Sequence, residues 1–406
     1  MIIKTKKLRW IVFLMFLLYV TNNAFFEKTL FFNEILSLIG LYVFLTYCLK
    51  KDLRMIVPKI SIFRLLMFFW LLCGIYLIIS LFFKTNWYFY LRNLSIFYST
   101  FTFFIGFYWK NDFLAFMHKI RNLLSIVVLS LIPAFPAHYE GRILDRYSIG
   151  TFFPFFFKKN NFITYLLLLI LNFAYAYFFQ SFTGVVMSIL LFIILILPRY
   201  AYFKILFSIS LVAFIFLFMH LSPYLAKYKE GEKGKDLFGN LSYVYSHSKI
   251  LQADPNSSWR MVYWYRIVVE NFPGNLAGIG FGTPYIPYTE GKNSAESLYD
   301  DKHDAHTTGT HNTFITIFAR LGIGVLVFFV LLYSAVLREF YSFKEYYLSN
   351  NNIVFFMSFF AISIIGLFNP TLETPTYSGM YWFFLGLVAS AVYQRHSENN
   401  TNSPLD

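Results

Sequence analysis

Long apolar runs separated by short polar gaps are the feature that most limits what this chain can fold into. Only 14% of the residues are charged and 58% are hydrophobic, so polar side chains are too few to coat a water-soluble globule. A helix that spans a bilayer needs about 20 mostly apolar residues. The sequence therefore predicts an all-α integral membrane protein. Its candidate spans are residues 8–26, 29–49, 60–83, 94–109, 113–136, 162–180, 182–197, 202–222, 311–337, 353–369 and 377–395.

Basic residues in the gaps predict how the chain crosses the membrane. The net charge of +13 comes from clusters beside the apolar runs, which is typical of cytoplasmic loops, so nucleic acid is not an expected partner. The basic gaps 50–59 and 198–204 are expected in the cytoplasm, and the long loop that follows is expected outside. Both termini are then cytoplasmic, which requires an even number of helices. A Pro-broken stretch at 137–161 is where a twelfth helix is expected.

The expected topology divides the chain into four parts. Transmembrane helices fill residues 1–222, and residues 223–310 form one large extracytoplasmic loop that contains short helices. Three more transmembrane helices occupy residues 311–395, and residues 396–406 form a cytoplasmic tail. Loops as long as 223–310 are usually functional or disordered, so this loop is where chemistry is expected.

Two patterns stand out within the loop. Residues 258–272 have the spacing of an amphipathic helix, which puts Arg260 and Trp264 on one face because they are four residues apart. The glycines of Gly278-Ile279-Gly280-Phe281-Gly282 are too close together for a dinucleotide-binding fingerprint. They predict a tight turn whose backbone approaches a ligand or a helix.

His311 opens the first helix after the loop and lies at the expected water boundary. An ordinary histidine pKa of about 6.5 suits a general base near neutral pH, although a helix-capping or interfacial histidine would look the same. Arg64 and Arg320 lie inside apolar runs, where a charge is costly. Arg320 comes nine residues after His311, on the opposite helix face, so structural pairing or snorkelling is the interpretation we favour. The acidic and histidine-containing stretch 300–306 fits no metal-ligand spacing.

Taken together, these motifs resemble the O-antigen ligase and polymerase family of bacterial surface-polysaccharide enzymes. Arg260-x3-Trp264, Asn271-Phe272-Pro273 and the glycine series resemble the family's large periplasmic loop. His311-Asn312-Thr313-Phe314 with Arg320-Leu321-Gly322-Ile323-Gly324 resembles the start of the helix after that loop. One departure is Phe182, where the family usually has an arginine. The resemblance implies that the pyrophosphate-binding cation is either missing or supplied by another residue, for which Arg142, Arg146 and Arg266 are the candidates.

The resemblance implies an inner-membrane glycosyltransferase of lipopolysaccharide biosynthesis. It would transfer a glycan from undecaprenyl pyrophosphate to a sugar hydroxyl of an acceptor, with inversion and without a metal or other cofactor. His311 is expected to be the base and Arg260 the phosphate-binding residue, with Trp264 and Asn312 contacting substrate. The acceptor is either a lipid-linked repeat unit, for a polymerase with a possible chain-length regulator, or lipid A-core, for a ligase. The alternatives are a transporter or flippase of lipid-linked oligosaccharide and an inactive or scaffolding relative of the family.

Overall fold

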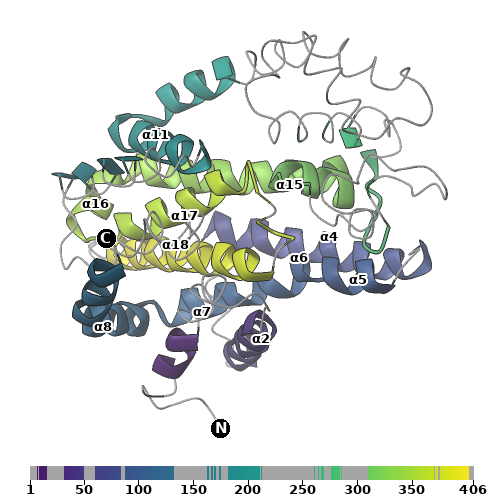
Figure 1. Ribbon diagram of the computed structural model, residues 1–406, viewed down its shortest axis with the longest axis horizontal. Coiled ribbons are helices and arrows are strands. Elements are labelled where there is room, and N and C mark those ends of the chain that lie inside the picture. The colour runs from purple at the N-terminus through teal and green to yellow at the C-terminus, as the bar shows by residue number, and fades with distance from the viewer. Residues whose placement is uncertain are drawn as a thin grey trace. The chain divides into compact units, whose positions relative to one another are not determined.

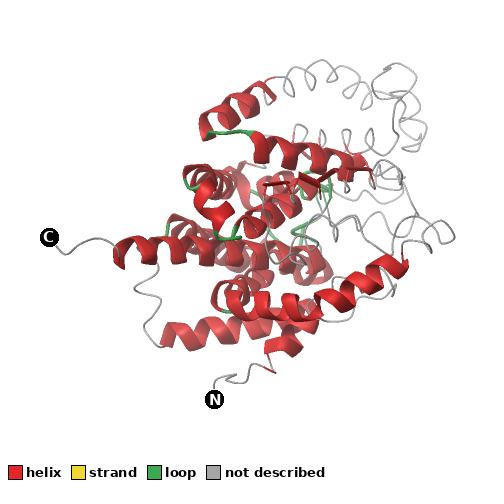
Figure 2. Cartoon of the chain, turned by 90° about the vertical axis from the view of Figure 1, so that its left-hand side faces the viewer, coloured by secondary structure: helices red, strands yellow, loops and turns green. Residues whose placement is uncertain are grey.

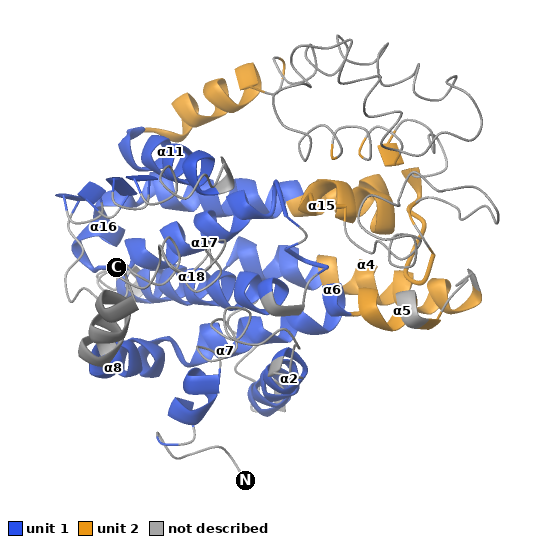
Figure 3. Ribbon diagram, viewed as in Figure 1, with its two compact units in different colours: residues 1–68, 95–198, 330–406 blue, residues 69–94, 199–329 orange. Residues whose placement is uncertain are grey.

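Helices alone make up the regular structure of the described residues, as expected (Figure 2). The chain divides into two compact units (Figure 3). Residues 1–68, 95–198 and 330–406 form the first unit, and residues 69–94 and 199–329 form the second. The computed structural model describes residues 7, 9–15, 32–49, 60–83, 87–131, 162–163, 166–167, 169–170, 173–174, 182–210, 212, 260, 264, 267–268, 276–283, 285, 310–369, 371–373 and 375–401.

Two helices of the described part are long and apolar enough to cross a membrane, Ser61–Phe82 and Thr313–Ser342. Apolar side chains lie on the outside of the first: Phe82 is 80% exposed and Leu71 is 60% exposed, a surface that suits lipid. Shorter apolar helices cover Asn33–Tyr47, Gly184–Ile196 and Ile353–Ile365.

The helix bounds follow the expected runs closely in several places (Figure 1). They are α2 Phe32–Leu49, α4 Ser61–Phe83, α8 Lys110–Leu131, α11 Phe182–Ile196, α15 Thr313–Ser342, α17 Ile353–Ile365 and α18 Pro375–Thr401. Helix α15 ends five residues later than expected, and α18 continues six residues into the expected tail. Several expected runs extend beyond the described residues, and the stretch 137–161 lies outside them. The number of twelve therefore stays a prediction.

The expected span 94–109 is instead a series of short helices. These are α6 Ser95–Tyr98, the 3₁₀ turn η1 Ser99–Phe101 and α7 Thr102–Tyr108, and a further short helix, α5 Trp87–Asn93, precedes them. Thr102 donates its hydroxyl hydrogen bond to the carbonyls of Ser99 (2.7 Å) and Gly379 (2.8 Å). Side-chain bonds of this kind compete with the regular helix ladder, and Thr102 lies where η1 ends and α7 begins.

Glycines allow close helix packing in the first unit, where α7 lies along α18 (Figure 1). A Cβ added to Gly106 would meet the carbonyl oxygen of Phe383, and one added to Gly386 would meet that of Phe103. Neither glycine could carry a side chain without moving the backbones apart. Small residues at helix crossings are how membrane helices gain close contact when lipid supplies no hydrophobic driving force.

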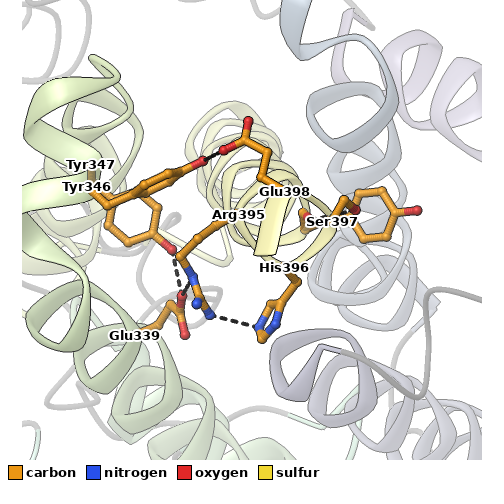
Figure 4. A network of polar contacts seen from close by, with 8 residues as sticks. Glu339, Tyr346, Tyr347, Arg395, His396, Ser397 and Glu398 are labelled. Atoms are coloured by element: carbon orange, nitrogen blue, oxygen red, sulfur yellow. Dashed lines mark hydrogen bonds and ion pairs between the residues drawn. The ribbon is translucent and has the colours of Figure 1, made fainter. Parts of the chain in front are cut away.

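A polar network joins the end of α15 to α16 (Lys344–Ser349) and α18 (Figure 4). The carboxylate of Glu339 accepts hydrogen bonds from Arg395 (2.8 Å) and from the Tyr347 hydroxyl (2.6 Å). Tyr346 donates to Glu398 at 2.6 Å. Arg395 is buried, so this pairing satisfies a cation that would otherwise be costly. The network fixes the end of α15 that is distant in sequence from His311.

Candidate active site

The start of α15 is fixed by a capping residue, Asn312. Its side-chain oxygen accepts hydrogen bonds from the backbone N–H groups of Phe314 (2.9 Å) and Ile315 (3.1 Å). Asparagine is among the best residues for this position because it satisfies amides that have no partner within the helix. The cap is therefore Asn312 and not His311, which removes one of the two structural interpretations of the histidine.

Hydrogen bonds of threonine hydroxyls hold the backbone of Asn312 in place. The Thr310 hydroxyl accepts the backbone N–H of Asn312 at 3.1 Å and pairs with the hydroxyl of Thr316 at 2.8 Å. Thr310 and Thr316 are both buried. The residues on either side of His311 are thus held by hydrogen bonds, so the histidine has little freedom to move along the helix axis.

His311 itself has an unusual backbone and an unusual charge environment. Its φ of 56° is in the left-handed region, which a non-glycine residue adopts at some cost and which is frequent at functional sites. Burial and then the positive charge of Arg260 lower the pKa of His311 to about 4. The imidazole is therefore neutral at pH 7, which is the state that can accept a proton. His311 and Arg260 are 51 positions apart in sequence, but they are close enough in space to interact electrostatically.

Trp264 links the Arg260 segment to His311. Arg260 and Trp264 are helical, as expected from their spacing, and Ile267–Val268 form a π-helical turn. The Trp264 indole N–H donates to the carbonyl oxygen of Thr310 at 2.6 Å. Trp264 is buried, so its ring anchors the segment beside the histidine.

The glycine-rich turn, residues 276–283, has the tight backbone that the sequence predicts. Gly278, Gly280 and Gly282 have φ values of 78°, 71° and 87°. Gly322 is the matching break in α15, with φ 74° and ψ 178°. That break removes the carbonyls of Ala319 and Arg320 from the helix ladder. The turn replaces the lost bonds: Ile279 N–H donates to Ala319 (2.7 Å) and Gly280 N–H donates to Arg320 (2.9 Å).

The turn and the helix break touch backbone to backbone. A Cβ at Gly278 would lie 2.6 Å from the nitrogen of Gly322, and one at Gly322 would lie 2.6 Å from the carbonyl oxygen of Leu276. Both positions require glycine because no side chain fits between the two backbone segments. Of the two partners the sequence analysis allowed, a ligand or a helix, the turn approaches a helix.

Helix α4 holds the other side of the glycine-rich turn. The Tyr76 hydroxyl donates to the carbonyl of Ala277, and the Ser80 hydroxyl accepts the backbone N–H of Phe281 at 2.8 Å. Tyr76 and Ser80 are four residues apart, so they share one helix face. The sequence carries no signal for this contact, because 201 residues separate each pair of partners.

Arg64 and Arg320, which the sequence places within apolar runs, have different environments. Arg64 is exposed on the first turn of α4, as snorkelling requires. Arg320 is fully buried and donates from Nη1 to the carbonyls of Gly280 (3.2 Å) and Thr283. Its guanidinium carbon lies 3.9 Å from the centre of the Tyr285 ring. Structural pairing of Arg320 is thus confirmed, and its partners belong to the glycine-rich turn.

Other residues that were weighed as site candidates fall outside the described part of the chain. These are the candidate pyrophosphate-binding cations Arg142, Arg146 and Arg266, and the stretch 300–306. Within the described residues, no group of His, Cys, Asp and Glu side chains has the arrangement of a metal site. Thr310, Tyr76 and Ser80 were not predicted from the sequence, because their roles depend on contacts rather than on a motif.

Comparison with known proteins matches part of the chain to a family. Residues 160–330 match the family model described as O-antigen ligase, a range that holds Arg260, Trp264, the glycine-rich turn and His311. No curated protein and no solved structure matches the chain. With these residues inside the matched range, the chain is similar to O-antigen ligases over residues 160–330, and its apolar helices suit a membrane protein.

Proposed function

We propose that this protein transfers a glycan from undecaprenyl pyrophosphate to a sugar hydroxyl, with inversion at the anomeric carbon and without a metal. The observation that carries the proposal is that Arg260 lies near enough to His311 to lower the pKa of this buried histidine, with both residues inside the matched range. One group can accept a proton and the other can hold an anion. Transfer from a pyrophosphate-linked donor to a hydroxyl requires both.

His311 acts as the general base in this mechanism. As the acceptor oxygen forms its bond to the anomeric carbon, its proton passes to the imidazole. The bond from that carbon to the pyrophosphate oxygen breaks, and undecaprenyl pyrophosphate leaves with the bonding electrons. Such positioned bases contribute about 10²- to 10⁴-fold to a rate. A single displacement inverts the configuration of the anomeric carbon.

Arg260 acts as the phosphate-binding cation. A guanidinium forms paired hydrogen bonds with phosphate oxygens, and its fixed charge stabilises the leaving group as negative charge develops. The same charge lowers the pKa of His311 in the free protein. A bound pyrophosphate would offset the charge of Arg260 and raise the pKa of His311, so donor binding would make the histidine a stronger base.

Two acceptors are compatible with this chemistry. A polymerase would extend a lipid-linked repeat unit, with a chain-length regulator as an expected partner, and a ligase would transfer the finished chain to lipid A-core. The surface-glycan profile of a deletion strain separates them. Core carrying one repeat unit identifies a polymerase, whereas unmodified core with long chains left on the lipid carrier identifies a ligase.

Complementation of the deletion strain tests the proposed residues. His311→Ala should restore no glycan at normal membrane levels of the protein, since the base is lost. Arg260→Lys should be severely impaired because an ammonium group cannot form the paired hydrogen bonds that a guanidinium forms with phosphate. Arg338→Lys is the matched control, since Arg338 is exposed on α15. A wild-type glycan profile with His311→Ala would remove the histidine from the mechanism.

A further inference from the structure

Arg320 is bonded to the glycine-rich turn in two directions at once. Its backbone carbonyl accepts the N–H of Gly280 at 2.9 Å, and its side-chain Nη1 donates to the carbonyl of Gly280 at 3.2 Å. A further bond from Nη1 reaches the carbonyl of Thr283. Arg320 therefore bonds to the turn with both its backbone and its side chain, two residues before the helix break at Gly322.

The helix break makes this contact important for the residues that precede it. Gly322 separates α15 into a short first piece, 313–321, and the longer remainder. A helix of nine residues is too short to be stable alone, because few bonds compensate for its nucleation. Its geometry depends on what holds its two ends. His311 and Asn312, which caps the helix, lie at one end, and Arg320 lies at the other.

Both ends of the short piece are attached to the segment that precedes α15. At the first end, Trp264 donates to the carbonyl of Thr310, next to His311. At the second end, the glycine-rich turn bonds to Ala319 and Arg320. The turn is held in its own place by Tyr76 and Ser80 of α4. The first piece of α15 is thus clamped between two fixed points.

An arginine suits this clamp better than other cations. A buried charge is costly, and it persists only where hydrogen bonds and polarisable groups surround it. Two carbonyls accept from Nη1, and the planar guanidinium lies over the ring of Tyr285. A lysine could donate to the carbonyls, but it could not stack in this way.

We propose that Arg320 is a positioning residue, which acts by clamping the glycine-rich turn to the break in α15 so that the short helix presents His311 to the reacting groups. This role rests on the proposed glycosyl transfer. Arg320 acts through the histidine and does not itself touch the substrate.

Hydrogen exchange tests the clamp without reference to activity. In the full-length protein, Arg320→Met should speed exchange in the peptide covering 276–283 by about ten-fold or more. The variant removes both hydrogen bonds from Nη1 to the turn, and the loss of one hydrogen bond to a charged group already has an effect of about that size. Exchange in α18 should not change. Arg338→Met makes the same substitution at an exposed position of α15 and should have no effect. Unchanged exchange of the turn in Arg320→Met would overturn the clamp.

Kinetics of glycan transfer test the positioning role. Arg320→Met should lower kcat by about ten-fold or more and leave the KM for the lipid-linked donor within about two-fold. Arg320→Lys should recover part of the rate. The pH at which activity is lost on acidification should also rise. A loosened His311 becomes more hydrated, so burial no longer lowers its pKa and only the charge of Arg260 still does. Simple loss of folded protein would lower the rate at every pH and leave the profile unmoved.

Two results would contradict the proposal. A raised KM for the donor at unchanged kcat would make Arg320 a phosphate ligand, and faster exchange with unchanged transfer would separate the clamp from His311. If Arg320→Met does not fold, Ser80→Ala loosens the turn from the α4 side and should change exchange and kcat in the same direction. If the wild-type protein transfers no glycan, the proposed function fails and the positioning role with it, while exchange still decides whether the clamp exists.

Discussion

Replacing Gly322 by alanine tests whether the break in α15 is built into the backbone. The new Cβ would lie 2.6 Å from the carbonyl oxygen of Leu276 and 2.8 Å from the carbonyl carbon of Ala277. Both are main-chain atoms, so no side-chain rotation relieves the contact. The glycine-rich turn must move away, or α15 must straighten, and in either case the turn separates from the helix.

The expected loss has two parts. A φ of 74° with a ψ of 178° is a conformation that only glycine adopts readily, and forcing another residue into it costs about 1–3 kcal/mol. Separation also breaks the bonds of Ile279 and Gly280 to the helix carbonyls, each worth about 1 kcal/mol. Gly322→Ala should therefore lower the free energy of unfolding by roughly 3–5 kcal/mol.

Gly324→Ala is the matched control on the same helix. A Cβ there has no neighbour within 4 Å, and Gly324 lies in the helical part of α15. Because alanine is the better helix former, this variant should gain up to about 1 kcal/mol. Unfolding by SDS titration in mixed micelles, followed by circular dichroism, measures both. Equal stabilities of the two variants would refute the packing of the turn against the helix break.

Three further predictions concern the site and the topology. For His311, kcat/KM should be nearly equal at pH 7 and pH 5.5, because a pKa of about 4 leaves about 97% of the imidazole neutral at pH 5.5, whereas an ordinary histidine would be about 9% neutral. A loss centred near pH 6.5 would contradict this. For Asn312, alanine should cost about 1 kcal/mol of stability while aspartate keeps the cap. Aspartate should nevertheless impair transfer, since it lacks the amide N–H and repels pyrophosphate; wild-type transfer would make Asn312 a cap only. A cysteine at Asn293 should react with a membrane-impermeant thiol reagent from outside the inner membrane, and labelling only after permeabilisation would invert the topology.

Two helices are predicted closely by their apolar runs. Runs 60–83 and 182–197 lie within a residue of α4 and α11 at each end, because burial in lipid and regular backbone bonding agree along their length. The prediction of one helix over run 94–109 is wrong, because apolar content says nothing about the bonds that hydroxyl groups form. Thr102 bonds to backbone carbonyls and helps to divide that run into short helices.

The site was predictable only where neighbours in sequence are neighbours in space. The spacing of glycines predicts the tight turn, and the position of His311 predicts its place before a helix. The contacts of Ser80 with Phe281 and of Trp264 with Thr310 depend on folding distant segments together, which no local pattern shows. The low pKa of His311 has the same origin, because burial and a distant Arg260 cause it.

Transfer by the purified protein in liposomes tests the central claim most directly. The assay supplies an undecaprenyl-pyrophosphate-linked glycan and an acceptor, and it measures the new glycosidic bond together with the released lipid pyrophosphate. We predict that wild type forms both in equal amounts and that His311→Gln, which keeps a polar side chain, is slower by about 10²- to 10⁴-fold. Transfer by His311→Gln at the wild-type rate would contradict the account.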